Sequence, residues 1–418
     1  MGRIIINGGK QLAGRIKVTG AKNTILPILA AAIISGKKSV IHGCPHISDV
    51  DNTLEILNDI GCKTVFSGDT ITVDSSGVSK YTIAEELMDK MRSSMVLNGA
   101  VIARMKRAEA SYPGGCELGL RPIDLHIKAF REMGIEISEE HGFISFDGRN
   151  IKSADIHLSY PSVGATENIM LAACGAKGKT RIINAAKEPE ISDLADFINA
   201  MGGKVRGAGS SIIEIEGAEE YKDCEHTIIP DRIVAATYIA AAVITKSIIE
   251  IENINSEHMN AIFAAFKEAG VVFENCWDNV IKVIPPEKLC AVRQIRTEPY
   301  PGFPTDAQSI ISSVLTLSEG TSIITENIFD RRFRHLDELI KMGADITING
   351  NCAVIKGTDK LSGAKVSATD LRSGAALVIA ALGADGVSEV ANTCYIDRGY
   401  EDICGNLRKL GADIRYID

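Results

Sequence analysis

Closely spaced cysteine pairs, long apolar runs and an excess of positive charge are all missing from this sequence. The ten cysteines are scattered along the chain, so neither a zinc knuckle nor a small disulfide scaffold is indicated. We expect most of them to be small, buried apolar residues. The net charge of −9 at pH 7 gives no general argument for nucleic acid or an anionic membrane as a partner. An anionic ligand would therefore need a local cluster of lysine and arginine.

The apolar segments are too short to cross a bilayer. The longest run, 233–244, is interrupted by Thr237 and falls short of the roughly 20 residues that a membrane-spanning helix needs. The first residues contain only three consecutive apolar side chains, Ile4–Ile6, too few for a secretory leader. We therefore predict a cytoplasmic protein that inserts into no membrane.

Familiar cofactor and metal motifs are also missing. The chain has no GxxxxGK[ST] loop, no GxSxG elbow and no HExxH pair, and GAGSSI (207–212) lacks the third glycine of a dinucleotide fingerprint. His42 and His46 have helical spacing, but Pro45 between them argues against a helix and thus against a metal site. We expect neither a metal nor a cofactor.

A pattern that recurs six times organises the whole chain. Each copy contains an amphipathic helix closed by a glycine, the residue best suited to the left-handed conformation that ends a helix. The six glycines follow one another at intervals of 68 or 73 residues: Gly61, Gly134, Gly202, Gly270, Gly343 and Gly411. A strand-like run follows each of them.

A second kind of helix, apolar nearly all round, precedes these glycines. TILPILAAAII (24–34) and RSGAALVIAAL (372–382) are examples, and helices of this kind are buried ones. We predict six copies of one α/β unit, each with a buried helix, a strand, an amphipathic helix and further strands. Six units suggest two domains of three, with a boundary near 226–233.

Charged residues gather where the buried helices begin. A single Asn, Thr or Asp there is explained by helix capping alone. Lysine and arginine are unfavourable at the positive end of a helix, so their recurrence suggests an anionic ligand. The wider set in loops and helix starts comprises Lys22, Arg92, Arg121, Asp306, Arg332, Arg372 and Arg398. Any one of these alone would more often be part of a solvated face, but several converging guanidinium groups would suit a small, highly charged anion.

Eight segments, in this order, carry a resemblance to a known family. They are GAKNTILPILAAAI, PGGCELGLRPIDLH, PSVGATENIMLAA, NAAKEPEISDLADF, IPDRI, YPGFPTDAQ, ATDLRSGAALV and DRGYE. Over essentially all 418 residues the chain resembles the enolpyruvyl transferases, and among them those that act on UDP-N-acetylglucosamine.

The resemblance implies an α/β fold of two inside-out α/β barrel domains, each of three repeated βαβαββ-type units. Residues 22–229 would form the N-terminal domain, with a lid loop around Cys116. Residues 1–21 plus 230–418 would form the C-terminal domain, and the active site would lie in the cleft between them.

The implied activity is a transferase reaction without a cofactor. The enolpyruvyl group of phosphoenolpyruvate would pass to the 3-hydroxyl of UDP-N-acetylglucosamine by addition and elimination, releasing phosphate. This is the first committed step of peptidoglycan precursor synthesis, with its links to cell shape and division. The resemblance also implies fosfomycin as a covalent inhibitor, and we expect a monomer or weak homo-oligomer.

Residue roles follow from matching positions in the family's motifs. Asp306 would be the base facing the sugar hydroxyl. Cys116 would be a proton donor that forms an adduct with phosphoenolpyruvate and is alkylated by fosfomycin. We expect Arg121 to favour its thiolate and Glu117 to oppose it. Departures from the family's usual residues stand at Leu120 and Tyr395.

The remaining positions are implied to bind the substrates. Phosphoenolpyruvate would contact Lys22 and Asn23, and Lys22 would also take part in the chemistry. Its phosphate would be bound by Arg121 and Arg398. Its carboxylate would lie near Arg332 and Arg372. The UDP-sugar would be held by Arg92, Arg121, Pro122, Ile123, Asp124, Leu125, Ser162, Val163, Gly164 and Ile328.

Three alternatives are weighed against this reading. The sister enzyme enolpyruvylshikimate-phosphate synthase shares the repeat, but the Gly-Gly-Cys loop and Asn23 argue against it. A six-repeat ring around DNA would need basic, solvated helices, whereas the first helices here are apolar. A UDP-sugar-binding paralogue without turnover is disfavoured by the presence of Lys22, Cys116 and Asp306.

Overall fold

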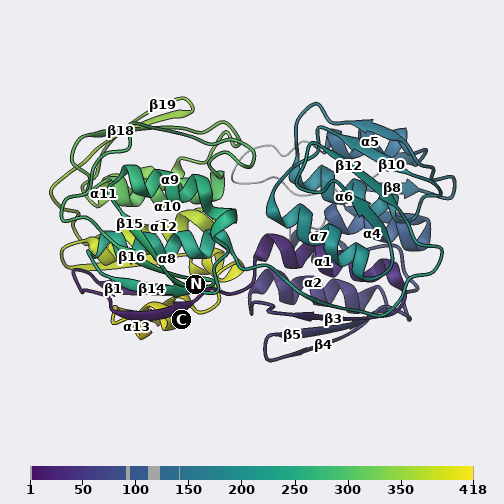
Figure 1. Cartoon of the computed structure of the whole chain (residues 1–418), viewed down its shortest axis with the longest axis horizontal. Helices are drawn as coiled ribbons and strands as arrows, with labels where there is room; N and C mark the ends of the chain where they lie inside the picture. The colour runs from purple at the N-terminus through teal and green to yellow at the C-terminus, as the bar shows by residue number, and fades with distance from the viewer. Residues whose placement is uncertain (1, 91–94, 112–122, 141, 418) are drawn as a thin grey trace. The chain divides into compact units, whose positions relative to one another are not determined.

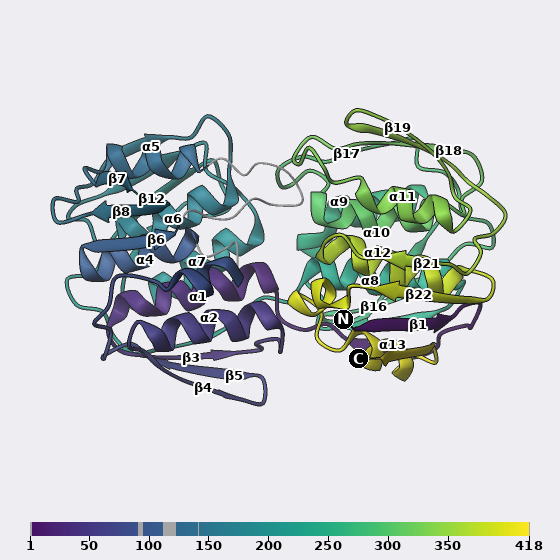
Figure 2. The same ribbon diagram turned by 180° about the vertical axis from the view of Figure 1, so that it is seen from behind.

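The computed structural model describes residues 2–90, 95–111, 123–140 and 142–417. These residues form two compact units, one within Gly20–Ile229 and the other made of the residues up to Thr19 together with those from Pro230 onward. Figures 1 and 2 show each unit from opposite sides, with helices inside and strands outside. Each unit has its own continuous apolar core.

Three sheets surround the helices of the 20–229 unit. Their strand orders are β13-β3-β5-β4, β6-β8-β7 and β11-β12-β10-β9. The strands are β3 (Lys38–His42), β4 (Lys63–Ser67), β5 (Thr70–Asp74), β6 (Arg107–Ser111), β7 (Glu136–Glu140), β8 (Phe143–Asp147), β9 (Asp155–His157), β10 (Thr180–Ile183), β11 (Lys204–Arg206), β12 (Ile212–Glu216) and β13 (Cys224–Thr227). In the three-stranded sheet, a parallel bridge between Thr82 and Glu109 stands where the other sheets have a fourth strand.

Three four-stranded sheets surround the helices of the other unit. Their orders are β15-β16-β14-β2, β17-β18-β20-β19 and β21-β22-β1-β23. The strands are β1 (Arg3–Asn7), β2 (Gly14–Lys17), β14 (Ile249–Glu252), β15 (Val272–Trp277), β16 (Val280–Ile284), β17 (Gln294–Arg296), β18 (Thr321–Thr325), β19 (Asp345–Asn349), β20 (Cys352–Lys356), β21 (Lys365–Ser367), β22 (Val387–Ala391) and β23 (Asp413–Ile417). The first strand pairs antiparallel with β22 and β23, and β2 pairs parallel with β14.

The apolar helices form the centre of each unit, as their composition predicts. They are α1 (Lys22–Ser35), α4 (Met95–Met105) and α6 (Val163–Ala173) in one unit, and α8 (Arg232–Ile244), α10 (Thr305–Leu315) and α12 (Leu371–Gly383) in the other. Nearly every residue of these helices is buried, including all but one residue of α1. A helix with no exposed face cannot be oriented by amphipathicity, so the surrounding elements fix its place.

The amphipathic helices each bury one face and end at the expected glycines. They are α2 (Ser48–Asp59), α5 (Asp124–Glu132), α7 (Pro189–Ala200), α9 (Asn260–Glu268), α11 (Arg334–Lys341) and α13 (Ile403–Lys409); the short α3 (Glu85–Lys90), η2 (Ser256–Met259) and η3 (Thr393–Arg398) complete the helical elements. All six glycines have positive φ, from 76° at Gly134 to 110° at Gly61. The repeat is therefore confirmed, although the strands in the described residues form separate sheets and no closed barrel.

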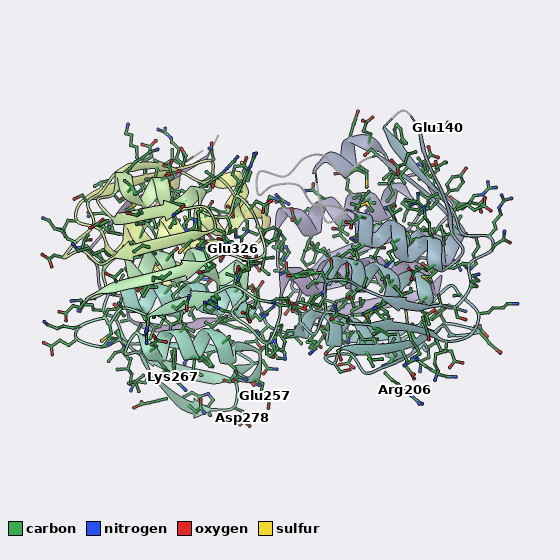
Figure 3. All side chains as sticks on the ribbon, turned by 90° about the horizontal axis from the view of Figure 1, so that it is seen from above. Glu140, Arg206, Glu257, Lys267, Asp278 and Glu326 are labelled. Atoms are coloured by element: carbon green, nitrogen blue, oxygen red, sulfur yellow. The ribbon has the colours of Figure 1, made fainter. Side chains whose placement is uncertain are left out.

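Charged side chains lie mainly on the outside of the units. In Figure 3 the labelled Glu140, Arg206, Lys267 and Asp278 are exposed residues, whereas Glu326 is buried. Among the helices that the structure describes, none combines the length and apolarity needed to cross a membrane. Of the nine cysteines in the described ranges, four are buried, three are partly buried and two are exposed, so the expectation of mostly buried thiols is only partly right.

Candidate active site

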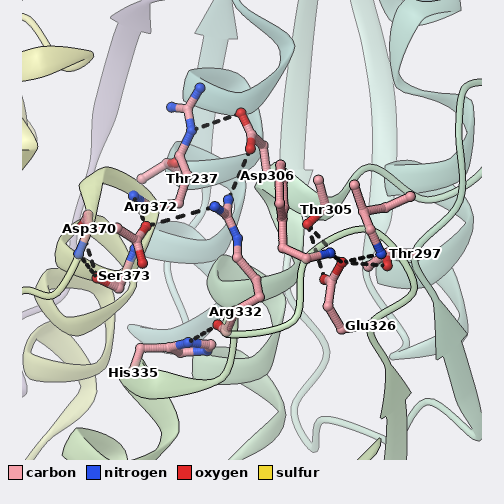
Figure 4. Close-up of polar contacts among 12 residues, drawn as sticks. Thr237, Thr297, Thr305, Asp306, Glu326, Arg332, His335, Asp370, Arg372 and Ser373 are labelled. Atoms are coloured by element: carbon pink, nitrogen blue, oxygen red, sulfur yellow. Dashed lines mark hydrogen bonds and ion pairs between the residues drawn. The ribbon is translucent and has the colours of Figure 1, made fainter. Parts of the chain in front are cut away.

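A carboxylate held between two arginines is the central feature of the unit that contains the residues up to Thr19 and those from Pro230 onward. Asp306 is the second residue of α10. Its Oδ1 accepts a hydrogen bond from Arg332 Nη2 at 2.9 Å, and its Oδ2 accepts one from Arg372 Nε at 3.3 Å (Figure 4). The two arginine side chains are 4% and 2% exposed, whereas that of Asp306 is 26% exposed. The two buried arginines thus fix the orientation of the Asp306 carboxylate, which stays partly exposed to solvent.

The start of α12 positions Arg372. Asp370 is the N-cap residue, and its carboxylate accepts hydrogen bonds from the backbone N–H groups of Arg372 and Ser373. The Ser373 hydroxyl accepts one from the backbone N–H of Asp370, which completes a capping box. Asp370 Oδ1 also lies 3.9 Å from Arg332 Nη1. One capping residue therefore fixes the helix that carries Arg372 and contacts the other arginine.

Tyr400 supports the buried charge of Arg372. The guanidinium lies over the Tyr400 ring, 5.5 Å from its centroid, and the phenol is 2.8 Å from the Thr237 hydroxyl. Burial by itself would lower the pKa of Arg372, but Tyr400, Asp306 and Asp231 raise it, and the net pKa lies above its ordinary value. Arg372 therefore stays a cation in spite of its burial.

Several nitrogens of these arginines lack a full hydrogen-bond partner among the residues that the structure describes. Nη1 and Nη2 of Arg372 and Nε of Arg332 are buried, and apart from the interaction of the Arg372 guanidinium with the Tyr400 phenol they meet no acceptor there. A buried charged donor without an acceptor is costly, because it has lost its water and gained nothing in return. Guanidinium donors suit carboxylate and phosphate oxygens, so the cluster has the chemistry of an anion site.

Glu326 holds the backbone around this cluster. The carboxylate is 3% exposed, and Oε1 accepts hydrogen bonds from the Thr297 and Thr305 hydroxyls and from the backbone N–H groups of Ile328 and Phe329 (Figure 4). Thr305 is the first residue of α10, directly before Asp306. Glu326 thereby ties the start of α10 to the loop containing Ile328, a residue that the sequence assigns to the UDP-sugar.

His335, on α11, packs beneath Arg332 and is fully buried. Its Nδ1 lies 3.1 Å from the carbonyl oxygen of Arg332, and its Nε2 lies 2.8 Å from the Ser312 hydroxyl. The pKa of His335 is lowered to about 4, mainly by burial; Asp370 and the bond to the Arg332 carbonyl raise it in part, and the Arg332 charge lowers it. The imidazole is therefore neutral at physiological pH.

Acid should weaken the fold through His335. The folded pKa of about 4 lies below the ordinary value of 6.5, so the unfolded chain binds the proton first as the pH falls. The free energy of unfolding should drop between pH 6.5 and 4, by up to about 3 kcal/mol from this group. Denaturant unfolding of the wild type and His335→Asn across this range checks it: the stability advantage of the wild type should shrink toward pH 4. An advantage that stays constant with pH would contradict the prediction.

In the 20–229 unit, Lys22 occupies an unfavourable position that a carboxylate stabilises. It is the first residue of α1, where the helix dipole opposes a cation, and no side chain caps this end. Its Nζ lies 2.8 Å from Oδ2 of Asp49, in the first turn of α2, and both residues are buried. Asn23, the next residue, is exposed. The lysine is thus held in place, with an exposed amide beside it.

The helix starts assigned to the UDP-sugar are connected to one another. Ser162 caps α6 by accepting a hydrogen bond from the backbone N–H of Ala165 at 3.3 Å. His126 of α5 accepts one at Nδ1 from the Asn168 amide of α6, at 2.9 Å. This bond links α5, which begins at Asp124, to α6, which begins at Val163, and these are the helices whose first residues are assigned to the UDP-sugar.

Buried acids in the same unit were not foreseen from the sequence. Glu167 on α6 and Glu188 and Glu190 at the start of α7 are all buried. Burial raises the pKa of Glu167 well above its ordinary value, and Glu190 and Glu188 add to the effect. Glutamates in NAAKEPE resemble any charged loop in sequence, so only the fold reveals their burial.

The structure places the sequence-predicted residues in two groups. Asp306, Arg332 and Arg372 come together, and Ile328 joins them through Glu326; Arg398 ends η3, which also contains Tyr395. The other unit contains Lys22, Asn23, Ile123, Asp124, Leu125, Ser162, Val163 and Gly164.

Six residues singled out from the sequence lie outside the described residues: Arg92, Cys116, Glu117, Leu120, Arg121 and Pro122. Sequence reasoning missed Asp49, Glu326, His335 and Tyr400. The tendency of buried charges to pair could have suggested a partner for Lys22 such as Asp49, but no sequence signal pointed to the other three. No group of metal-ligating side chains occurs among the residues described.

Comparison with known proteins identifies relatives of the whole chain. Residues 6–407 match the family model of EPSP synthase (3-phosphoshikimate 1-carboxyvinyltransferase). The chain is 52% identical over 414 residues to UDP-N-acetylglucosamine 1-carboxyvinyltransferase 2 of Caldanaerobacter subterraneus subsp. tengcongensis, covering 99% of both chains. It is 46% identical to UDP-N-acetylglucosamine 1-carboxyvinyltransferase of Halothermothrix orenii, covering 100% of both.

Solved structures show the same fold at lower identity. The enolpyruvyl transferase NikO from Streptomyces tendae aligns with a TM-score of 0.91 at 23% identity, covering 99% of this chain and 98% of that one. EPSP synthase from Acinetobacter baumannii aligns with a TM-score of 0.76 at 18% identity, covering 100% of both chains. At these identities the likeness concerns the fold alone.

Proposed function

Because the chain belongs to the EPSP synthase family of enolpyruvyl transferases, we propose that it acts as a UDP-N-acetylglucosamine 1-carboxyvinyltransferase. It transfers the enolpyruvyl group of phosphoenolpyruvate to the 3-hydroxyl of UDP-N-acetylglucosamine and releases phosphate. Full-length relatives at 41–52% identity carry this name. The observation that carries the proposal is the Asp306 cluster, where a carboxylate lies beside buried guanidinium nitrogens that donate no hydrogen bond to a carboxylate or carbonyl of the described residues.

The reaction balances as an addition followed by an elimination. In the addition, the sugar hydroxyl loses its proton and its oxygen bonds to C2 of phosphoenolpyruvate, while C3 gains a proton. In the elimination, C3 loses a proton and the bond from C2 to the phosphate oxygen breaks. A base near the hydroxyl, an acid near C3 and cations on the carboxylate and phosphate are therefore needed.

The described residues suit these roles. We assign the base to Asp306, whose carboxylate is oriented by Arg332 and Arg372 and remains partly exposed. The free nitrogens of the two arginines are assigned to the carboxylate of phosphoenolpyruvate. Lys22 and Asn23 are assigned to the same substrate, and Ile123–Leu125, Ser162–Gly164 and Ile328 to the UDP-sugar. Arg92, Cys116, Arg121, Pro122 and Arg398 keep the roles that the sequence resemblance gives them.

The biological setting is part of the same proposal. The reaction would supply peptidoglycan precursor synthesis in the cytoplasm, without a metal or a cofactor. We propose a monomer or weak homo-oligomer, with residues 22–229 as one domain and residues 1–21 plus 230–418 as the other.

Phosphate release tests this function directly. We would measure release from phosphoenolpyruvate with UDP-N-acetylglucosamine, with shikimate 3-phosphate, and with neither acceptor. Release that requires the UDP-sugar supports the proposal. Release only with the shikimate acceptor would assign the chain to the reaction that its family model names, and no release with either would leave a binding protein.

Fosfomycin tests the proposed role of Cys116. The wild type should lose activity on incubation with the drug, because the thiolate opens its epoxide. Cys116→Asp should keep turnover and resist inhibition, since a carboxylic acid can donate a proton but is a poorer nucleophile. Cys290→Asp, at an exposed thiol in the other unit, is the matched control and should stay sensitive. A Cys116→Asp enzyme as sensitive as the wild type would show that the drug does not act through this residue.

A further inference from the structure

His335 contacts two segments that carry site residues, α10 and the backbone of Arg332. Its Nε2 lies 2.8 Å from the hydroxyl of Ser312, on the same helix, α10, as Asp306. Its Nδ1 lies 3.1 Å from the backbone carbonyl of Arg332, just before α11. The ring is fully buried, so both contacts are shielded from water.

The chemistry of the partners assigns the proton on the ring. A backbone carbonyl only accepts hydrogen bonds, so Nδ1 must carry a hydrogen and donate it to Arg332. In the neutral ring Nε2 is then an acceptor. It faces the Ser312 hydroxyl, whose single hydrogen is shared with the carbonyl of Ser309, also 2.8 Å away. The ring is therefore bonded to the Arg332 backbone through Nδ1 and packs against Ser312 of α10 through Nε2.

The Arg332 side chain depends on an accurately placed backbone. Its guanidinium reaches Asp306 Oδ1 at 2.9 Å and lies 3.9 Å from Asp370 Oδ1, while Nε meets no acceptor in the described part of the chain. Because the side chain is long, a small rotation of the Arg332 peptide would shift its guanidinium farther than it shifts the backbone. Such shifts matter because anchoring interactions require tight geometry.

We propose that His335 is a positioning residue: by donating from Nδ1 to the Arg332 carbonyl, it fixes the backbone just before α11 and so sets the Arg332 guanidinium for the carboxylate of the enolpyruvyl donor. The proposal rests on the function proposed above, because that function makes Arg332 a contact of phosphoenolpyruvate. It predicts that the Nδ1 bond matters for substrate binding and that the Nε2 bond matters chiefly for packing.

Two amide substitutions separate these bonds. In His335→Asn the side-chain amide nitrogen can occupy the place of Nδ1 and still donate to Arg332. In His335→Gln it can occupy the place of Nε2, which leaves the Arg332 carbonyl without its donor. Both variants lose the ring and its packing, so a purely structural role would affect them alike. Ser312→Ala removes the Nε2 partner together with the local bond from the Ser312 hydroxyl to the Ser309 carbonyl, leaves the Nδ1 bond intact, and serves as the matched control.

Steady-state kinetics and thermal unfolding give the primary readout. His335→Gln should raise the KM for phosphoenolpyruvate roughly tenfold, a change on the scale of one lost hydrogen bond. His335→Asn and Ser312→Ala should stay within about threefold of the wild type, while all three variants unfold at lower temperature. In an Arg332→Met background His335→Gln should add nothing further. Equal KM values for the Asn and Gln variants, or additive effects with Arg332→Met, would overturn the proposal.

A readout that needs no turnover separates this inference from the proposed function. The Nε–H signal of Arg332 in NMR spectra of the arginine side chains should persist in the wild type and His335→Asn and be broadened or shifted in His335→Gln. Failure of the wild type to release phosphate would sink the proposed function and leave this comparison valid. Unchanged Arg332 signals in His335→Gln would sink the positioning role, whatever the enzyme's substrate.

Discussion

Replacing Asp306 by asparagine is expected to reduce phosphate release at least about a thousandfold, within the range seen when a general base is lost. The amide has nearly the same shape but cannot accept the proton of the sugar hydroxyl. It would also present an NH₂ group to one of the two arginines that now donate to the carboxylate. UDP-sugar binding should remain near that of the wild type, which calorimetric titration would measure beside turnover.

Glu338→Gln is the matched control for this experiment. Glu338 is a buried carboxylate of the same unit that accepts hydrogen bonds from Lys341 and from the backbone N–H of Ser367, away from the Asp306 contacts. It should lose some stability and little activity. An Asp306→Asn enzyme that releases phosphate at nearly the wild-type rate would refute the assignment of Asp306 as the base.

Replacing Arg372 by lysine is expected to lower kcat/KM for phosphoenolpyruvate by about a hundredfold or more, chiefly through KM. Lysine keeps the positive charge, but its single ammonium cannot both meet Asp306 Oδ2 and present the two planar nitrogens that are free in Arg372. The contact with the Tyr400 ring would also weaken. Initial rates at varied phosphoenolpyruvate and saturating UDP-sugar measure the effect.

Arg408→Lys is the corresponding arginine control. Arg408 belongs to the same unit as Arg372. Its Nε and Nη2 both donate to the carbonyl of Ile414 and do not contact Asp306. Its replacement should change kcat/KM little, and thermal unfolding of both variants reports any loss of fold. A KM in Arg372→Lys equal to that of the wild type would show that the free nitrogens of Arg372 do not bind this substrate.

Parts of the candidate site could be read from the sequence because they depend on local signals. Asp306 and Arg372 stand at the starts of helices whose apolar composition already marked them as buried, so a charge there required an explanation. Arg332 stood in a charge-rich loop that gave no hint of its burial. Its role came from the family resemblance, and its proximity to Asp306 came only from the fold.

The supporting residues could not be read in this way. Glu326 and His335 act through backbone groups and hydroxyls of segments that are distant in sequence, as in the contact between His335 and Ser312. Asp49 likewise pairs with Lys22 across two helices. A glutamate or histidine beside an apolar strand or helix has the same local signature whether it faces solvent or the core.

The sequence by itself determined the six-fold repeat, because helix-closing glycines and the contrast between apolar and amphipathic helices are local features that every copy must satisfy. It also determined the family, through motifs spread over the whole chain. Only the tertiary structure decided which strands pair, so that β1 joins β22 and β23 near the other end of the chain. It likewise decided which charges meet, because burial removes the water that would otherwise solvate each group alone and makes pairing necessary.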